Sequence, residues 1–298
     1  MLWITNLILF ASILNCHGYE NIEGRVVNGV TAKNIIPYQA SIRVSVRDYL
    51  RFGRGHTCGG VLISRRTVTT AAHCLTDGAR MRTVFDIHVV FGSLNRYIFT
   101  DETVIMHAEK IIMHPKYRRF ESLEHDIGLV ILRRNVELSD IIHPIPLIDF
   151  AIPTGNRCQI SGWGATQWRG LMPLQLQKAN VSIVDRNFCN ASYSERFGTS
   201  ITYGMVCANG QTESGKIIDA CQGDSGGPLQ CDDKLVGLSS FGVSCGASFD
   251  IPGVYVDIYY YHNWIMENWK NNGVMQKSHK TSIFMFTLFV NLIWNLKS

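Results

Sequence analysis

Eight cysteines spread between residues 58 and 245 constrain this chain more than any other feature of its sequence. They are Cys58, Cys74, Cys158, Cys189, Cys207, Cys221, Cys231 and Cys245. An even number of cysteines over such a span indicates disulfide bonds and an oxidising compartment. No CxxC pair occurs, and the histidines do not lie at zinc-ligand spacing from the cysteines, so no metal site is expected. Spacing alone leaves the connectivity open among about a hundred pairings.

The first 18 residues have the pattern of a secretory signal peptide. An apolar run, Leu7–Phe10, is followed by a short segment that contains Cys16 and ends at Gly18. A basic segment before the run is missing, and a buried core helix is the alternative. The cysteine pattern that follows favours secretion, so residues 1–18 are expected to be removed and the protein to be extracellular.

The opposite terminus, residues 271–298, ends in an almost wholly apolar run from Ile283 to Leu296. As a helix this run would span about 21 Å, less than the roughly 30 Å of a membrane core. A polar spacer, Gln276–Ser282, precedes it, and small residues precede the spacer. This order is typical of a lipid-anchor attachment signal, which would hold the protein at the outer cell surface. A short signal-anchor-like tail and a segment docked on the domain surface are the alternatives.

Between its ends the chain has the pattern of an all-β protein. Short runs rich in Val, Ile, Tyr and Phe are bounded by Gly, Asn, Asp or Pro, as at Val84–Phe91, Ile127–Leu132 and Leu235–Phe241. Helical spacing of apolar residues occurs only at Tyr259–Lys270. An all-β domain with a terminal helix is therefore expected.

The charge pattern excludes one class of partner. The net charge of +4 is small and scattered, so nucleic acid is not expected as a partner. Arginines at positions 43, 47, 51 and 54 do gather in one short stretch. We interpret that stretch as a solvated loop rather than a dedicated anion-binding patch.

Three short motifs carry the residue types of a catalytic triad. His73 lies beside Cys74 in the string TAAHC, Asp126 heads the apolar string DIGL, and Ser225 lies in the glycine-rich string GDSGGP. Singly, each has a structural explanation: a core histidine, an aspartate that caps a strand, and a tight turn. All three in this order favour nucleophilic catalysis, because a serine hydroxyl needs a base and the base needs an orienting acid.

With these motifs, the chain from Val26 to about residue 270 resembles the trypsin-like serine proteases of the chymotrypsin fold. The resemblance implies two packed six-stranded antiparallel β-barrels with a C-terminal helix. His73 and Asp126 would come from the first barrel and Ser225 from the second, with the catalytic cleft between them.

The resemblance also implies the role of each residue. Ser225 would attack the scissile carbonyl, His73 would accept its proton and pass it to the leaving amine, and Asp126 would orient the imidazole. The main-chain N–H groups of Gly223 and Ser225 would form the oxyanion hole.

An activation site is implied between Arg25 and Val26, which would make residues 19–25 a propeptide and residues 26–270 the peptidase domain. Cleavage would free the α-amino group of Val26, which would form a buried ion pair with Asp224 and hold the oxyanion turn in its active shape.

The specificity pocket is implied to have Asp219 at its base and Gly242 and Gly253 in its walls. A carboxylate buried there needs a cationic partner, and an Arg or Lys side chain of the substrate supplies one. Ala220 offers no hydroxyl to assist Lys, so Arg is expected to be preferred.

The disulfide pairings implied by the resemblance are Cys58–Cys74, Cys158–Cys231, Cys189–Cys207 and Cys221–Cys245. The loop that binds calcium in some relatives has Ser93, Thr100 and Thr103 at its carboxylate positions, so no calcium and no cofactor are expected. Asn180 and Asn190 begin glycosylation sequons.

The sequence thus predicts a secreted serine endopeptidase, made as a zymogen, that cleaves after Arg or Lys. Its expected partners are protein or peptide substrates, an activating protease and protein inhibitors, and a monomer is expected. A catalytically weak or inactive homologue that acts as a binding module is the alternative, which the intact triad, Gly223 and Asp224 argue against. A third interpretation, a membrane-bound adhesion protein, is supported only by the apolar C-terminal tail.

Overall fold

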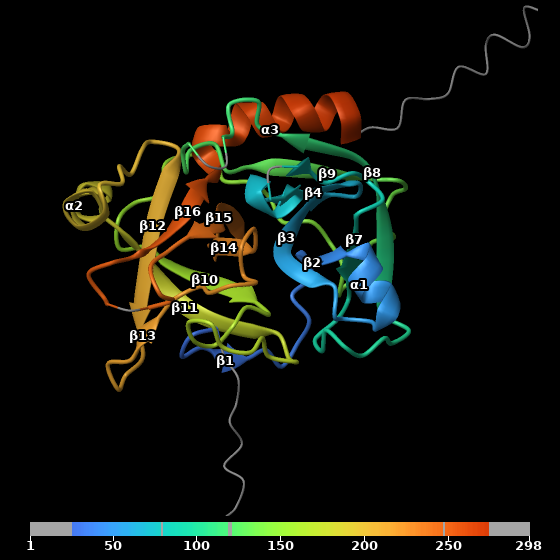
Figure 1. Ribbon diagram of the computed structural model, residues 1–298, viewed down its shortest axis with the longest axis horizontal. Coiled ribbons are helices and arrows are strands. Elements are labelled where there is room, and N and C mark those ends of the chain that lie inside the picture. The colour runs from blue at the N-terminus through green and yellow to red at the C-terminus, as the bar shows by residue number, and fades with distance from the viewer. Residues whose placement is uncertain (1–25, 79, 119–120, 247, 274–298) are drawn as a thin grey trace, which may run out of the picture.

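The computed structural model describes residues 26–273, except for 79, 119–120 and 247 (Figure 1). The predicted signal peptide, the propeptide with Arg25, and the polar spacer and apolar run of the tail lie outside the described residues. Within the described part of the chain, no helix is both long enough and apolar enough to cross a membrane.

The first half of the chain forms a closed six-stranded barrel with the strand order β2-β3-β4-β9-β8-β7. Every pair of neighbouring strands is antiparallel. Short apolar strands form it because each can bury one face against the barrel interior. Its strands are β2 (Gln39–Val44), β3 (His56–Ser64), β4 (Thr67–Thr70), β7 (Ile87–Phe91), β8 (Val104–Met113) and β9 (Gly128–Leu132).

The second half forms another six-stranded barrel, ordered β11-β10-β14-β15-β16-β12 and closed by the pairing of β11 with β12. Two short strands extend it: β1 (Val30–Thr31) pairs with β11, and β13 (Ile217–Ile218) pairs with β12. The barrel strands are β10 (Arg157–Gly162), β11 (Gln177–Val184), β12 (Met205–Gln211), β14 (Pro228–Cys231), β15 (Lys234–Phe241) and β16 (Gly253–Asp257). The predicted pair of six-stranded antiparallel barrels is therefore confirmed.

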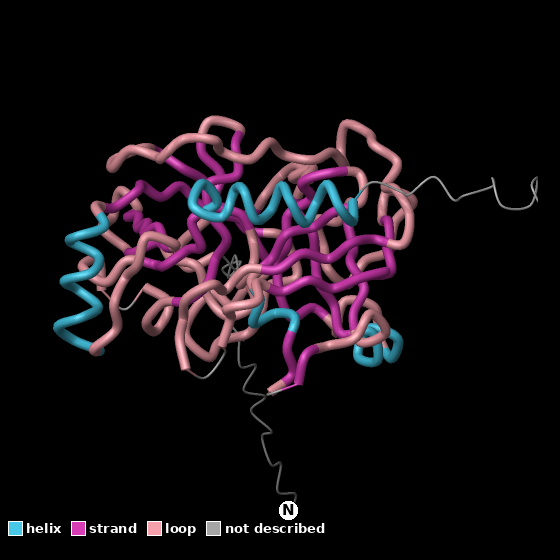
Figure 2. Tube along the Cα trace, turned by 90° about the horizontal axis from the view of Figure 1, so that it is seen from above, coloured by secondary structure: helices cyan, strands magenta, loops and turns pink. Residues whose placement is uncertain are grey.

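The predicted C-terminal helix is also confirmed, as α3 (Ile258–Gly273). This helix contacts β9 of the first barrel and β15 of the second (Figures 1 and 2). Its buried side chains Tyr261 and Ile265 belong to the apolar cluster that also contains Leu129 of the first barrel and Leu229 of the second. The helix therefore joins the two barrels on the side where their cores meet.

Three short helical segments occur besides α3 in the described part of the chain, and the spacing of apolar residues predicts none of them. They are α1 (Ser45–Leu50), a 3₁₀ turn at Ala72–Leu75, and α2 (Arg186–Phe197). Helix α2 buries only Cys189 and Tyr193, so its sequence shows almost no apolar stripe. Its ends are nevertheless well defined, since the Asp185 carboxylate accepts from the N–H of Phe188 at 3.0 Å and Gly198 ends it in the left-handed conformation.

Four disulfide bonds connect the loops and strands around the second barrel and the first. They are Cys58–Cys74, Cys158–Cys231, Cys189–Cys207 and Cys221–Cys245, so every pairing implied by the resemblance is confirmed. Each bridge stabilises the fold by roughly 2–4 kcal/mol, chiefly by restricting the unfolded chain.

A two-stranded antiparallel ribbon of β5 (Thr76–Asp77) and β6 (Arg80–Met81) completes the secondary structure around the first barrel.

Candidate active site

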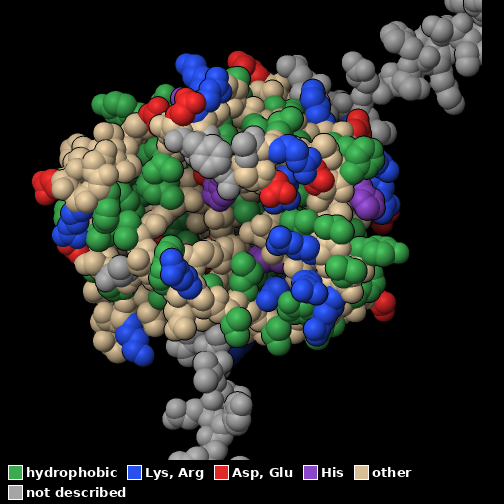
Figure 3. All heavy atoms as spheres, viewed as in Figure 1, with side chains coloured by type: hydrophobic (Ala, Val, Ile, Leu, Met, Phe, Trp, Pro, Cys, Tyr) green, Lys and Arg blue, Asp and Glu red, His purple; other side chains and the backbone are tan. Residues whose placement is uncertain are grey.

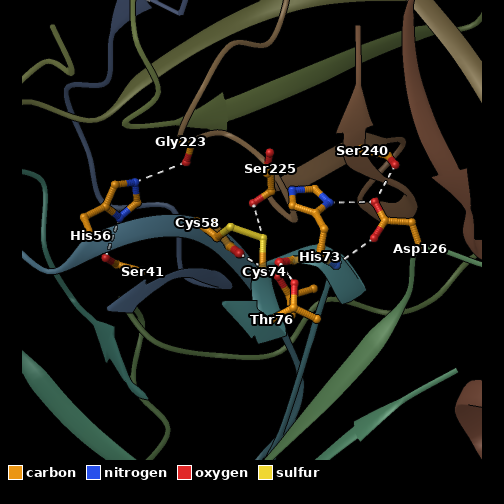
Figure 4. Close-up of a disulfide and its surroundings, with 12 residues drawn as sticks. Ser41, His56, Cys58, His73, Cys74, Thr76, Asp126, Gly223, Ser225 and Ser240 are labelled. Carbon is orange, nitrogen blue, oxygen red and sulfur yellow. Dashed lines mark hydrogen bonds and ion pairs between the residues drawn. A yellow bond between two sulfur atoms is a disulfide. The ribbon is translucent and has the colours of Figure 1, made fainter. Parts of the chain in front are cut away.

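His73 and Asp126 meet at one end of the first barrel. His73 lies in the 3₁₀ turn after β4, and the disulfide of its neighbour Cys74 ties this turn to β3. The Nδ1 atom of His73 is 2.8 Å from Oδ2 of Asp126, and the main-chain N–H of His73 donates to Oδ1 at 2.8 Å. Asp126 is buried two residues before β9, and its carboxylate fixes both the imidazole and the backbone that carries it (Figure 4).

Ser240, on β15 of the second barrel, donates a third hydrogen bond to Asp126. Its Oγ lies 2.6 Å from Oδ2 of Asp126. This hydrogen bond from the second barrel helps to hold the Asp126 carboxylate in position. Ser240 could not be predicted from the sequence, because 114 positions separate it from Asp126 and no local motif marks it.

Ser225 comes to the same place from the second barrel. Its carbonyl oxygen accepts from the N–H of Gly59 on β3 at 2.9 Å and lies 3.5 Å from Sγ of Cys74. The imidazole of His73 lies between the Asp126 carboxylate and Ser225, with its Nδ1 toward Asp126 (Figure 4). The remaining ring nitrogen, Nε2, is therefore the one on the serine side. The three residues predicted as a triad are brought together across the barrel interface.

Within the part of the chain that the structure describes, the turn before Ser225 leaves two N–H groups without an acceptor. Gly223 adopts φ +101°, a conformation that side-chain-bearing residues rarely adopt. The turn is closed by the N–H of Asp224, which donates to the carbonyl of Cys221 at 2.9 Å. Among the described residues, neither the N–H of Gly223 nor that of Ser225 donates a hydrogen bond. Both groups are thus available to a developing oxyanion.

A buried histidine supports this turn and was not found from the sequence. His56 lies between Oγ of Ser41, 2.8 Å from its Nδ1, and the carbonyl of Gly223, 3.1 Å from its Nε2. Burial lowers the pKa of His56 to about 3, with further lowering by the charges of Arg43 and Arg96. The ring is therefore neutral, and Nε2 carries the proton that it donates to Gly223.

Asp219 lies at the base of a cavity of about 170 Å³ that opens beside Ser225. Its carboxylate is 5% exposed and accepts from the N–H groups of Ala220 and Gly246, each at 2.8 Å. Burial raises the pKa of Asp219 to about 7. Both predicted wall glycines face it: a Cβ on Gly253 would meet Oδ1 of Asp219 at 2.5 Å, and one on Gly242 would lie 3.6 Å from Oδ2.

The cavity continues into a second hollow next to the triad. Ser240 and Phe241 line both, and His73 and Asp126 line the second. A substrate side chain in the Asp219 cavity can therefore lie in one continuous depression with the imidazole.

Asp224 points away from this depression into the protein. Its carboxylate accepts from the N–H groups of Gly164 at 2.7 Å and Cys221 at 3.0 Å. Burial raises the pKa of Asp224 to about 6. In the part of the chain that is described, no basic side chain forms an ion pair with it. Val26 is also buried, at 1% exposure, in the apolar cluster between the barrels, whereas Arg25 lies outside the described residues.

One grouping of metal-binding residue types occurs within the described residues: Cys58, His73 and Cys74. The two sulfurs of this group are joined in a disulfide, so they offer no thiolate to a metal ion.

The chain is similar to known trypsins along most of its length. The family described as Trypsin matches residues 26–265. Trypsin II-P29 of Gallus gallus is 36% identical over 82% of this chain and 89% of the relative. Trypsin-4 of Rattus norvegicus is 35% identical over 85% and 93%, and Trypsin theta of Drosophila melanogaster is 34% identical over 82% and 86%. The solved structure of neuropsin, a serine protease of mouse brain, superimposes with a TM-score of 0.67 at 33% identity, over 83% of this chain and 98% of neuropsin.

Proposed function

The chain belongs to the trypsin family of serine endopeptidases, and we propose that it is a secreted zymogen which, once cleaved after Arg25, hydrolyses peptide bonds that follow Arg or Lys. The observation that carries this proposal is the buried carboxylate of Asp219 at the base of the cavity beside Ser225.

The bond-breaking steps follow from the geometry of the triad. Oγ of Ser225 attacks the scissile carbonyl carbon while Nε2 of His73 takes its proton, and Asp126 stabilises the resulting imidazolium. The imidazolium then gives this proton to the leaving amine, so an acyl-enzyme remains on Ser225. Water, activated by the same imidazole, hydrolyses the ester and restores the serine.

The N–H groups of Gly223 and Ser225 stabilise the negative oxygen of each tetrahedral intermediate. One such donor contributes a factor of roughly 10²–10³ in rate. His56 donates to the carbonyl of Gly223 and so helps to hold the turn that carries both N–H groups.

The chemistry of the Asp219 cavity supports specificity for basic side chains. A buried carboxylate is costly to ionise, and the two main-chain hydrogen bonds that Asp219 accepts from described residues offset only part of that cost. A substrate cation offsets the rest. The guanidinium of arginine also fits a carboxylate with two parallel hydrogen bonds. Ala220 adds no hydroxyl that would assist the shorter reach of lysine, so arginine is preferred.

The surroundings of Asp224 support activation by cleavage. A buried carboxylate without a cationic side chain favours the approach of a new positive charge, and the α-amino group of Val26 would supply it. The ion pair would hold the turn at Gly223 and Ser225. Four disulfides support folding in an oxidising compartment and hence secretion.

Cleavage after Arg25 is expected to switch the activity on. The test uses a full-length variant whose propeptide ends in the recognition sequence of a site-specific protease that leaves Val26 as the first residue. Before cleavage, peptides with Arg, Lys or Phe before the scissile bond should not be hydrolysed. Afterwards, the Arg peptide should be cleaved faster than the Lys peptide, and the Phe peptide not at all.

Two variants make this test specific. Cleaved Asp224→Asn should lose about 10²–10³-fold in kcat/KM, because the new amino group then lacks its buried partner. Cleaved Ser225→Ala controls for contaminating proteases. A cleaved wild type that hydrolyses no peptide would identify an inactive homologue, whereas cleavage of the Phe peptide alone would contradict the assignment of Asp219.

A further inference from the structure

The four gathered arginines separate into one buried and three exposed side chains. Arg43 lies on β2 and is fully buried, so the interpretation of the whole stretch as a solvated loop was wrong. Arg47 on α1 and Arg51 and Arg54 on the loop that follows are exposed. No ion pair to any of these three occurs among the described residues.

A buried carboxylate holds this segment rigidly from below. Asp48 of α1 accepts from the N–H groups of Gly53 at 2.7 Å and Gly55 at 3.1 Å. It also accepts from Nε2 of His88 at 2.9 Å and lies 3.4 Å from Nη1 of Arg43. Burial by itself would raise the pKa of Asp48, but the bond from His88 and the charge of Arg43 hold it below its ordinary value. Asp48 is therefore ionised, and the positive charge of Arg43 balances its negative charge beneath the surface.

The outward side of the same segment is unusually apolar. Val46, Tyr49 and Leu50 are 68%, 93% and 73% exposed. Together with Arg47, Arg51 and Arg54 they form what we call the basic-apolar patch. Exposed apolar side chains gathered on a rigid element indicate an interaction surface. Lys and Arg side chains gather beside hydrophobic ones over α1 at the lower right of Figure 3.

Two neighbouring segments extend the apolar part of the patch. Phe85, 79% exposed, precedes Asp86, whose carbonyl accepts from the N–H of Ser45 at the start of α1. Phe99, 59% exposed, packs edge-on against Phe52 at 5.6 Å between ring centroids. The nearby acid Asp86 pairs with Arg80 at 3.0 Å, and Asp77 lies 3.9 Å from Arg82, so neither neutralises the arginines of the patch.

The patch lies within reach of a polypeptide held at Ser225. The strand β3 leads from the patch to Gly59, whose N–H donates to the carbonyl of Ser225. Gly59 follows Arg54 by five residues, a span of at most about 17 Å in extended chain. A substrate therefore needs only about five extended residues beyond the scissile bond region to contact the patch.

We propose that the basic-apolar patch binds a segment of the protein substrate that combines acidic with aromatic or aliphatic residues, about five or more residues from the scissile bond. Arginine recognises carboxylates with paired hydrogen bonds, and its guanidinium also stacks on aromatic rings. Charge complementarity selects an acidic segment, and the exposed Tyr49 and Leu50 select apolar residues within it. A sulfated polysaccharide would leave those apolar side chains uncovered. The identity of the occupant as substrate rests on the proposed function.

The first test measures binding without catalysis. The probe is a fluorescent 12-residue peptide of six Glu, three Phe and three Ser, and the protein is the activated full chain with Ser225→Ala. Binding is measured by fluorescence anisotropy. We expect the Kd to rise about tenfold or more in each of two double variants, Arg51→Glu/Arg54→Glu and Tyr49→Ser/Leu50→Ser. The exposed pair Arg133→Glu/Arg134→Glu is the charge control and should change the Kd less than about twofold. Equally tight binding of a peptide with Ser in place of Phe would overturn the proposal in favour of a general polyanion site.

The second test joins the same segment to a cleavable Arg peptide. The wild type should cleave this substrate with a kcat/KM about tenfold above that of the peptide without the segment, and the ratio should approach one in Arg51→Glu/Arg54→Glu. If neither substrate is cleaved but the probe binds, the proposed function fails and the patch remains. If both substrates are cleaved equally and the probe does not bind, only the patch is overturned.

Discussion

Replacing Asp126 by Asn is expected to lower kcat by about 10⁴-fold with little change in KM, the size of loss known for the best-studied triad of this type. The Asp126 carboxylate accepts from both Nδ1 and the main-chain N–H of His73. An asparagine amide can turn its NH₂ toward the ring, which would then carry its proton on Nε2 and could not accept one from Ser225. The measurement is kcat and KM for an Arg peptide with the activated enzyme.

Ser240→Ala is the matched control for this variant, because it removes one hydrogen bond to Asp126 but keeps the carboxylate. Loss of one such bond corresponds to about a tenfold reduction in kcat. If Asp126→Asn kept kcat within tenfold of the wild type, Asp126 would not be the residue that orients the base.

Replacing Asp219 by Asn should lower kcat/KM for Arg peptides by roughly 10²–10³-fold, since the substrate cation would then be buried without a counter-charge. The effect should appear equally in the Kd of a small guanidinium inhibitor. Burial raises the pKa of Asp219 to about 7. The wild-type affinity for the inhibitor should therefore fall as the pH falls through about 7, and the affinity of Asp219→Asn should not.

The same carboxylate links pH to stability. Because burial raises the pKa of Asp219 from 3.8 to about 7, the folded state holds a proton that the unfolded state has released between these values. This contribution to the free energy of unfolding is present at low pH and is lost as the pH rises through about 7. Asp219→Asn should therefore have a higher Tm than the wild type at pH 8, whereas the exposed Asp101→Asn should not.

For the binding measurement, an unchanged affinity of Asp219→Asn for the guanidinium inhibitor would contradict the assignment of Asp219 to the specificity pocket.

The local motifs around His73, Asp126 and Ser225 made the candidate site predictable, because each motif has a recognisable turn or strand start of its own. The short apolar runs predicted an all-β domain, whereas the two barrels and the disulfide pairings were implied by the resemblance. Ser240 and His56 were not, since they act through contacts with residues 114 and 167 positions away. Such contacts leave no periodic signal in the sequence.

The helices and the arginine stretch show a second limit. Helix α2 could have been found from its Asp185 cap and its final Gly198, but its weak apolar stripe concealed it. The burial of Arg43 depends on Asp48 and on the ring of Phe52, 4.3 Å from its guanidinium carbon. Hydropathy assigns every arginine to the surface, so only the tertiary structure distinguishes this one.

The most direct measurement is covalent labelling of the hydroxyl at position 225. A fluorophosphonate probe reacts with an activated serine by forming an O–P bond and releasing fluoride, and mass spectrometry locates the adduct. We expect one adduct per chain, on Ser225, in protein cleaved after Arg25, and labelling about 10³-fold slower or more when His73 is replaced by Ala. An unchanged labelling rate in the variant that lacks His73, or an adduct on another residue, would contradict the assignment of Ser225 as a nucleophile activated by His73 and Asp126.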